Sequence, residues 1–173
     1  TNYALQPMTL EEFIHQVTDG IPTPPSYFAK NASLNKNGYE NFDTLLNRGV
    51  KPLDVAAFEE EIKKGCLVID SRNPELFEAG FIKGAYNIGL NGQYAIWAAT
   101  LIDLKKPIVL VCNDGSEKES VLRLTRTGFE NITGYLKGGF DAWKNAGKPV
   151  DMVISVEPDE LAIDARFEEK IQI

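Results

Sequence analysis

Residues 107–120, PIVLVCNDGSEKES, are the stretch around which the rest of the chain is organised. Residues 108–111 are four consecutive apolar side chains, a pattern typical of a strand that is buried on both faces of a parallel sheet. The apolar run ends at Cys112, a short polar loop containing Gly115 follows, and apolar residues return at helical spacing from Val121. The stretch therefore predicts a strand, a tight loop and a helix, with Cys112 where the strand ends.

The position of Cys112 at the end of a predicted strand is one where ligand-binding residues are common in α/β proteins. In open α/β sheets, ligands bind at the carboxyl ends of the strands, beside the N-termini of helices. A thiol there has backbone N–H groups and the positive end of a helix dipole nearby, and both favour the thiolate. Cys112 is therefore a candidate nucleophile.

The segments on either side predict an alternation of helices and strands. Asp54 is expected to cap a helix over residues 55–63, a buried strand follows at residues 67–69, and Pro74 begins a short helix that ends near Gly80. Alternation of this kind implies a parallel sheet with helices on both faces. The other predicted elements are strands at residues 86–88 and 132–136, a helix capped by Asn91, a helix over residues 116–127, and a last helix over residues 140–145 that Gly147 terminates.

The N-terminal part has a different pattern. Residues 8–20 predict a helix that begins with a capping box of Thr9 and Glu12, and the prolines of residues 22–25 predict extended polyproline geometry. Residues 29–39 are polar and end in a turn. We therefore expect residues 1–49 to be an arm that links this domain to an upstream one.

The C-terminal part repeats the beginning of the domain. Residues 152–154 resemble a strand, residues 155–165 resemble a helix, and residues 170–173 resemble the start of another strand. The expected organisation is an arm over residues 1–49, an α/β domain over residues 50–149, and the start of a similar second domain over residues 150–173.

Composition and charge exclude several functions. The chain has 43% hydrophobic residues, a net charge of −7 and no basic cluster, so we expect a globular domain that does not bind nucleic acid. No run approaches the roughly 18 apolar residues that a membrane-spanning helix needs, and no signal peptide opens the sequence. These observations predict a cytoplasmic protein without a membrane partner.

The two cysteines are predicted to be free thiols. Cys66 opens one predicted strand and Cys112 closes another, so in a parallel sheet they lie roughly 15 Å apart, beyond the reach of a disulfide. The single histidine, His15, is expected on the solvent side of its helix, away from both. With one histidine and two separated cysteines, we expect neither a metal site nor a cofactor.

Three motifs in this order resemble the rhodanese family. Residues 67–90, LVIDSRNPELFEAGFIKGAYNIGL, resemble its N-terminal signature, residues 108–115, IVLVCNDG, its active-site strand and loop, and residues 134–143, GYLKGGFDAW, its closing strand and helix. The resemblance implies an α/β fold with a five-stranded parallel sheet. It also implies a sulfurtransferase whose cysteine carries sulfane sulfur as a persulfide, here on Cys112.

Two further stretches resemble a particular group of rhodanese-containing proteins. Residues 1–39 and 123–139 are similar to fusions in which a metallo-β-lactamase-fold persulfide dioxygenase is joined to one or two rhodanese domains. The resemblance implies an adjoining metallo-hydrolase domain as partner, with its metal ligands upstream of this chain. Assembly into a homo-oligomer is a further possibility that the sequence leaves open.

The resemblance also defines the candidate site residues. Asp70 and Arg72 are expected to form a buried structural pair that fixes the loops. In the active-site loop, the chain has Glu117 where active family members place an arginine. Outside the loop, it has Phe81 where the family commonly has histidine. The backbone expected to surround the donor belongs to Asn113, Asp114, Gly115, Ser116, Glu117 and Lys118.

Two interpretations of Cys112 remain open at this stage. In the first, the Cys112 thiolate accepts sulfur from a small sulfane-sulfur donor or a persulfide and passes it on. In the second, the acidic residues Asp114, Glu117 and Glu119 raise the pKa of the thiol and repel anionic donors, and the domain acts only as a scaffold. Lys118 stands six residues after Cys112, as the arginine of cysteine phosphatases does, but lysine lacks the planar fork that phosphate transfer needs.

Overall fold

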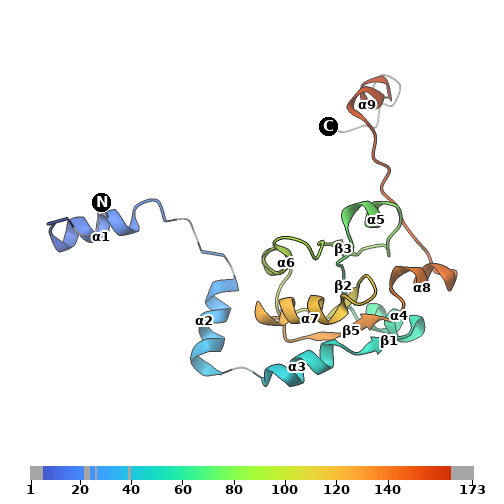
Figure 1. The fold of residues 1–173 in the computed structure, drawn as a ribbon, viewed down its shortest axis with the longest axis horizontal. Helices are drawn as coiled ribbons and strands as arrows, with labels where there is room; N and C mark the ends of the chain where they lie inside the picture. The colour runs from blue at the N-terminus through green and yellow to red at the C-terminus, as the bar shows by residue number, and fades with distance from the viewer. Residues whose placement is uncertain (1–5, 22–23, 26, 39, 165–173) are drawn as a thin grey trace.

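The computed structural model describes residues 6–21, 24–25, 27–38 and 40–164 (Figure 1). The central domain has a five-stranded sheet in which every strand pair is parallel, in the order β1-β5-β4-β2-β3. The strands are β1 (Pro52–Leu53), β2 (Leu67–Asp70), β3 (Tyr86–Asn87), β4 (Ile108–Val111) and β5 (Ile132–Leu136). This arrangement confirms the predicted rhodanese-like α/β fold.

Five helices alternate with these strands. They are α4 (Val55–Lys63), α5 (Pro74–Glu78), α6 (Tyr94–Leu101), α7 (Glu117–Arg126) and α8 (Gly139–Asn145). Asp54 caps α4 as predicted, since its carboxylate accepts a hydrogen bond from the Ala57 N–H at 2.8 Å. The cap predicted for α6 was wrong: the helix begins after Gln93 rather than Asn91, and the Gln93 side chain makes no capping hydrogen bond.

Side chains that alternate along the strands fill two separate cores. Ile69, Leu110 and Cys112 point to the face covered by α6 and α7, where Val121 and Leu124 of α7 pack against them. The side chains of the opposite face pack under α4 and α8, and they are Leu53, Val68, Val109, Val111 and Leu136. All four residues of β4 are fully buried, which explains why the central strand lacks polar alternation.

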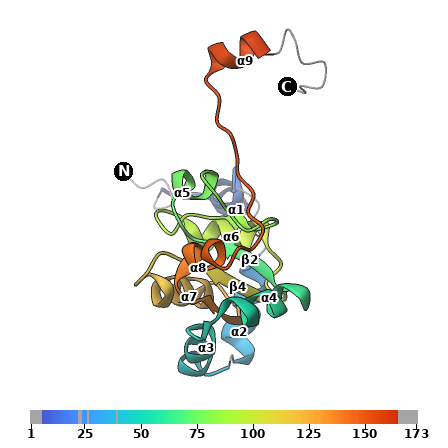
Figure 2. The same ribbon diagram turned by 90° about the vertical axis from the view of Figure 1, so that its right-hand side faces the viewer.

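The N-terminal region begins with a helix that is detached from the domain. Helix α1 (Leu10–Thr18) has the predicted capping box, with Thr9 Oγ1 accepting from the Glu12 N–H, but none of its residues is buried. Figure 1 shows α1 away from the central domain, and Figures 1 and 2 both show the same for helix α9 (Pro158–Asp164) near the other end of the chain. Two of the residues predicted to adopt polyproline geometry, at positions 22 and 23, lie outside the described residues.

Two further helices of the expected arm pack on the domain. Most of the stretch at residues 29–39, predicted only as polar and ending in a turn, is helical and belongs to α2 (Tyr27–Asn37). Tyr27 packs against the core under α6 and α7. Helix α3 (Phe42–Gly49) buries Leu45 and Gly49 against α7 and β5. A Cβ on Gly49 would lie 2.5 Å from Val121 Cγ1, so the two helices meet at glycine because no larger residue fits.

Beyond α8, residues 151–153 contact the end of α5 and the residues that follow it. Asp151 forms an antiparallel bridge with Phe81, and the Val153 N–H donates to the Glu78 carbonyl at 3.0 Å. The strand predicted at residues 152–154 is therefore reduced to one bridge at Asp151. Helix α9 (Pro158–Asp164) follows, and the strand predicted at residues 170–173 lies outside the described residues.

Candidate functional site

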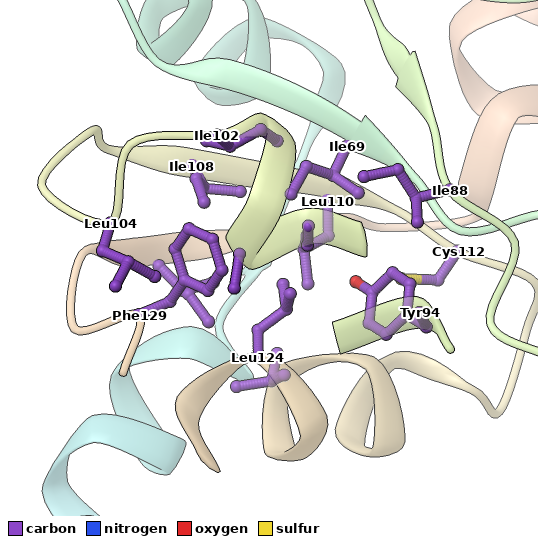
Figure 3. Packing of buried hydrophobic residues seen from close by; sticks show 14 residues of the cluster. Ile69, Ile88, Tyr94, Ile102, Leu104, Ile108, Leu110, Cys112, Leu124 and Phe129 are labelled. Atoms are coloured by element: carbon purple, nitrogen blue, oxygen red, sulfur yellow. The ribbon is translucent and has the colours of Figure 1, made fainter. Parts of the chain in front are cut away.

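The structure places Cys112 immediately after β4, inside the core rather than on the surface. Only 3% of the residue is exposed, although Asn113, Asp114 and Gly115 that follow it are exposed. The alternation along β4 directs the Cys112 side chain toward α6 and α7. Figure 3 shows its sulfur beside the ring of Tyr94, with Ile88 close by.

The loop after Cys112 is a tight turn that leads directly into α7. The Asn113 carbonyl accepts hydrogen bonds from the Ser116 N–H at 3.0 Å and from Ser116 Oγ at 2.7 Å. Gly115 has a φ of 82°, which a glycine adopts without strain at this position of a turn. Of the residues predicted to surround a donor, Glu117 and Lys118 therefore lie in the first turn of α7, and the loop is limited to residues 113–116.

Two buried hydroxyl groups are the polar neighbours of the thiol. Ser71, just after β2, donates to the Val111 carbonyl at 3.2 Å, and its Oγ lies 3.1 Å from Ser120 Oγ. Both serines are almost fully buried, Ser120 on the inner side of α7. They link the ends of β2 and β4 to the helix around Cys112.

The surroundings favour the neutral thiol over the thiolate. Burial raises the pKa of Cys112 from 9.0 to about 11, and the negative charges of Glu117 and Asp70 act in the same direction. The Ser71 and Ser120 hydroxyls favour the thiolate and oppose the rise. In this conformation the neutral thiol therefore predominates at pH 7.

Tyr94 covers the thiol from the side of α6. The residue is 1% exposed, and its hydroxyl has no hydrogen-bond partner among the described residues. A buried polar group without a partner costs about 1–3 kcal/mol. Burial also raises the pKa of the Tyr94 phenol well above its ordinary value, so the ring is a neutral cover. The closed position of Tyr94 is therefore held by packing, at the expense of its hydroxyl.

Arg123 of α7 holds the chain that leads into α6. Its guanidinium donates to the carbonyl of Leu90 and to that of Gly92, the latter at 2.6 Å, and lies 5.6 Å from the centre of the Tyr94 ring. Two hydrogen bonds and a cation–π contact from this one side chain thus hold the loop that leads into α6. Sequence reasoning missed Arg123 and Tyr94, because neither belongs to a local motif.

Asp70 and Arg72 form the buried pair that the sequence predicted. Arg72 Nη2 lies 2.6 Å from Asp70 Oδ2, and the two side chains are 8% and 0% exposed. Arg72 also donates to the Gly80 carbonyl at 2.8 Å and stacks over the Phe140 ring at 4.3 Å. The pair connects β2 to the loop after α5 and to α8, and it leaves no free cation for a substrate.

The rim of the site is acidic. Burial raises the pKa of Tyr135 on β5, and the charges of Glu117, Cys112 and Asp114 add to the rise, so all three groups lie near this phenol. Glu117 is also the residue that stands where active members of the rhodanese family have an arginine. The arrangement disfavours anionic molecules at the mouth of the loop.

The two thiols are free, as predicted from their positions at opposite strand ends. Cys66 is buried beside Glu61 and Thr133, with Sγ 3.5 Å from Glu61 Oε2, and it takes no part in the Cys112 site. Within the residues that the structure covers, no group of three metal-ligating side chains is suitably placed to hold an ion. The same residues include no helix of sufficient length and apolarity to cross a bilayer.

Comparison with known proteins agrees with this geometry. Residues 54–146 match the family described as "Rhodanese-like domain". A thiosulfate sulfurtransferase GlpE from Haemophilus influenzae (strain PittEE) is 31% identical over 93 residues, which are 53% of this chain and 86% of the relative. The GlpE protein of Pseudomonas putida F1 is 34% identical over 89 residues, 51% of this chain and 78% of the relative.

Solved structures share the fold. The rhodanese-like domain of the Anabaena protein Alr3790 aligns with a TM-score of 0.51 at 24% identity, covering 62% of this chain and 83% of that domain. A metallo-β-lactamase from Staphylococcus aureus aligns with a TM-score of 0.57 at 22% identity, covering 79% of this chain and 37% of that protein. The family match covers more than half of the chain and includes the strand and loop of Cys112, so this chain belongs to the rhodanese-like domain family.

Proposed function

We propose that this domain is a sulfur carrier in which Cys112 accepts a sulfane sulfur as a persulfide and passes it to an acceptor. The observation that carries the proposal is the position of Cys112, between the end of β4 and the turn that begins α7, in the matched part of a sulfurtransferase family. The N–H groups at the start of α7 and the buried hydroxyls of Ser71 and Ser120 supply the local polarity that a thiolate or persulfide anion needs.

The reaction is a nucleophilic transfer. The Cys112 thiolate attacks the outer sulfur of a donor R–S–S–H, the donor S–S bond breaks, and the organic part of the donor leaves as R–S⁻ with the bonding electron pair. Cys112 then holds the outer sulfur and its proton as Cys112–S–S–H. A thiol acceptor takes the sulfur in the same way and restores the Cys112 thiolate.

The acidic rim favours some donors over others. Thiosulfate carries two negative charges, and Asp114 and Glu117 both act on groups at the Cys112 site. An uncharged or protein-bound persulfide meets less repulsion on its approach. We therefore expect persulfides to load Cys112 faster than thiosulfate does.

A scaffold is the second candidate function, and the burial of Cys112 favours it. A thiol that is 3% exposed, with its pKa raised to about 11, is neither accessible nor ionised in this conformation. Glu117 at the position of the family's arginine points in the same direction. In that case the domain positions or assembles a neighbouring domain and carries no sulfur.

Intact-mass measurement separates the two functions. The protein is incubated with thiosulfate and, separately, with glutathione persulfide, and the mass of the unreduced chain is measured. We expect a gain of one sulfur atom from the persulfide, reversed by a reducing thiol, in the wild type and in Cys66→Ser. The gain should be absent in Cys112→Ser.

The Cys66→Ser variant is the matched control, since Cys66 is the other free thiol of the chain. An adduct that survives in Cys112→Ser would move the activity to Cys66 and contradict the proposal. The absence of an adduct from either donor would establish the scaffold instead.

We also propose that the domain works beside a metallo-hydrolase domain in the same polypeptide, with residues 1–49 as the connection and residues 150–173 as the start of a further domain. The alignment with the S. aureus metallo-β-lactamase supports this, because it extends over 79% of this chain and so beyond residues 54–146. Transfer of labelled sulfur from loaded Cys112 to a metallo-β-lactamase-fold persulfide dioxygenase would test it. Retention of the label on Cys112 would count against the partnership.

A further inference from the structure

A cavity of about 530 Å³ lies next to the Cys112 site and has no part in the reaction described above. The start of α5, the end of β3, the loop before α6 and one side of α6 form its walls. The volume is in the range of pockets that bind small organic molecules. Since β3 neighbours β2 at the edge of the sheet, the cavity lies at the carboxyl ends of the strands, where ligands of α/β proteins bind.

Two side chains of the cavity wall, Tyr94 and Ile88, also lie beside the sulfur of Cys112 (Figure 3). Tyr94 and Ile88 line the cavity and also belong to the buried cluster that contains Cys112. Figure 3 shows both of them beside the sulfur. Rotation of the Tyr94 ring would therefore open a direct path from the cavity to the thiol.

Tyr94 is held in a way that permits this rotation. Its hydroxyl has no partner in the closed position, although amide groups that could bind it line the cavity. The outer face of α6 is open to solvent, since Ile96, Trp97 and Leu101 are 43%, 55% and 59% exposed. Its N-terminal side is tied to α7 by the Arg123 contacts with the Leu90 and Gly92 carbonyls.

The lining of the cavity indicates which molecule it accepts. Asn73, Asn91 and Gln93 present amide groups that make no side-chain hydrogen bond within the described part of the chain, and Asn73 and Gln93 stand at N-cap positions without capping a helix. Trp97 adds an exposed aromatic face. Glu75 is the one charged residue of the lining, and no lysine or arginine accompanies it.

From these observations we propose that the cavity binds the organic carrier of the sulfur donor, that this carrier is amide-bearing and uncharged or cationic, and that Tyr94 is the gate between carrier and thiol. The inference rests on the proposed function and specifies its substrate class. The amides pair with the amides of the carrier, Trp97 packs on its apolar part, and Glu75 disfavours carboxylates. The transfer itself is the one already described, with the carrier as R.

Labelling of Cys112 tests the cavity without any sulfur transfer. In the Cys66→Ser background Cys112 is the only cysteine, so it can be titrated with aminoethyl methanethiosulfonate, a cation, and with sulfonatoethyl methanethiosulfonate, an anion. We expect the cation to react faster, and Glu75→Lys to shift the ratio of the two rates by about tenfold toward the anion. Glu11→Lys is the matched control, because it makes the same charge change on the detached helix α1 and should leave the ratio unaltered.

The gate is tested with the same reagents. Tyr94→Ala should speed the labelling of Cys112 by both ions, whereas Tyr94→Phe, which removes only the unpartnered hydroxyl, should slow it. The Phe variant keeps the ring in the core and so stands in for the Ala variant if that one fails to fold. Equal labelling rates in wild type and Tyr94→Phe, together with an unchanged ratio in Glu75→Lys, would overturn the inference.

Sulfur loading then distinguishes this inference from the proposed function. The persulfides of N-acetylcysteinamide, N-glycylcysteamine and glutathione all carry amides but are uncharged, cationic and anionic respectively, and we expect the first two to load Cys112 faster than the third. Equal loading by all three persulfides would refute the proposed binding of the donor's organic part in the cavity. It would leave the proposed function of the domain as a sulfur carrier unaffected. Charge-selective labelling that depends on Glu75, with no loading by any persulfide, would refute the proposed function and retain the cavity as the route to Cys112.

Discussion

At the residue scale, the chemistry of Cys112 depends on its burial more than on its neighbours in sequence. The exposed turn of residues 113–116 would leave a surface thiol accessible, but the strand directs the side chain inward, where Tyr94 covers it. Ser71 and Ser120 offer limited compensation to the anion, and Asp70, whose carboxylate is fully committed to Arg72, adds a negative charge nearby. In this structure the thiol is therefore covered, and the proposed sulfur transfer requires it to become accessible.

The raised pKa of Cys112 makes stability depend on pH in the alkaline range. The thiol has a pKa of about 11 when folded against 9.0 in its ordinary state, so the neutral form stabilises the fold below pH 9 and this contribution is lost as the pH rises toward 11. The shift corresponds to about 2–3 kcal/mol. Urea unfolding between pH 8 and about 11 should show wild type losing more stability than Cys112→Ser by roughly this amount.

Other groups also titrate in this range, but they are common to both proteins and cancel in the difference. Cys66→Ser is the control, and it should retain the part of the pH dependence that belongs to Cys112. Parallel stability profiles for wild type and Cys112→Ser would mean that the thiol is solvated in solution and that the gate stands open.

At the element scale, the positions of β5 and α6 set the shape of the site. The pairing of β4 with β5 shifts between Ile108 and Val109, so Val109 pairs with Gly134 rather than with Thr133. Gly134 has a φ of 152°, and a Cβ there would lie 2.6 Å from the Lys51 carbonyl. The register of β1, β5 and β4 therefore depends on the absence of a side chain at this residue.

We expect Gly134→Ala to destabilise the protein by about 2–3 kcal/mol, because the added methyl meets the Lys51 carbonyl just before β1 and the Leu53 side chain on β1. Chemical denaturation measures the effect. Gly147→Ala is the matched control, since its φ of 66° is also positive but open space surrounds it, and only the conformational cost of about 1 kcal/mol is expected. A loss at Gly134 no larger than that at Gly147 would show that β1 can shift to make room.

At the scale of the whole molecule, the α/β domain has a buried core, whereas helix α1 buries none of its residues. Residues from α2 and α3 pack on the domain, whereas α1 buries none of its residues and leaves Leu10 and Ile14 76% and 51% exposed. An apolar stripe of this kind contributes to stability only when something covers it. The free energy of unfolding should therefore belong to the residues between α2 and the bridge at Asp151.

Substitution of the stripe tests this division. Leu10→Ser with Ile14→Ser should change the free energy of unfolding by less than about 0.5 kcal/mol, because both side chains are solvated before and after unfolding. Leu136→Ala, at a residue that is 1% exposed, should cost about 2–5 kcal/mol in the same denaturation assay. A large effect of the double substitution would reveal that α1 is covered in solution.

Local patterns were sufficient wherever the signal lies within a few residues. The unbroken apolar run of β4, the Asp54 cap, the Thr9–Glu12 capping box and the Asp70–Arg72 pair are short-range features, and the structure has each of them. The three rhodanese motifs add the order in which these features occur. Together they determined the α/β fold, the family and the place of Cys112 at the end of its strand.

Features that depend on distant residues came only from the tertiary structure. Residues 27–37 are too polar for their pattern to predict a helix. In the structure they form α2, with Asn31 and Leu34 next to Gly128 and with Tyr27 packed against the core. The burial of Cys112 likewise depends on distant residues. Tyr94 at the start of α6 covers its side chain, and Arg123 of α7 holds the loop before α6 in place. Sequence by itself determined most elements of the α/β domain and the position of the candidate nucleophile Cys112, because hydrophobic period, caps and motifs act over one or two turns. Only the tertiary structure decided whether the Cys112 side chain is exposed or covered, because long-range packing sets its exposure and pKa.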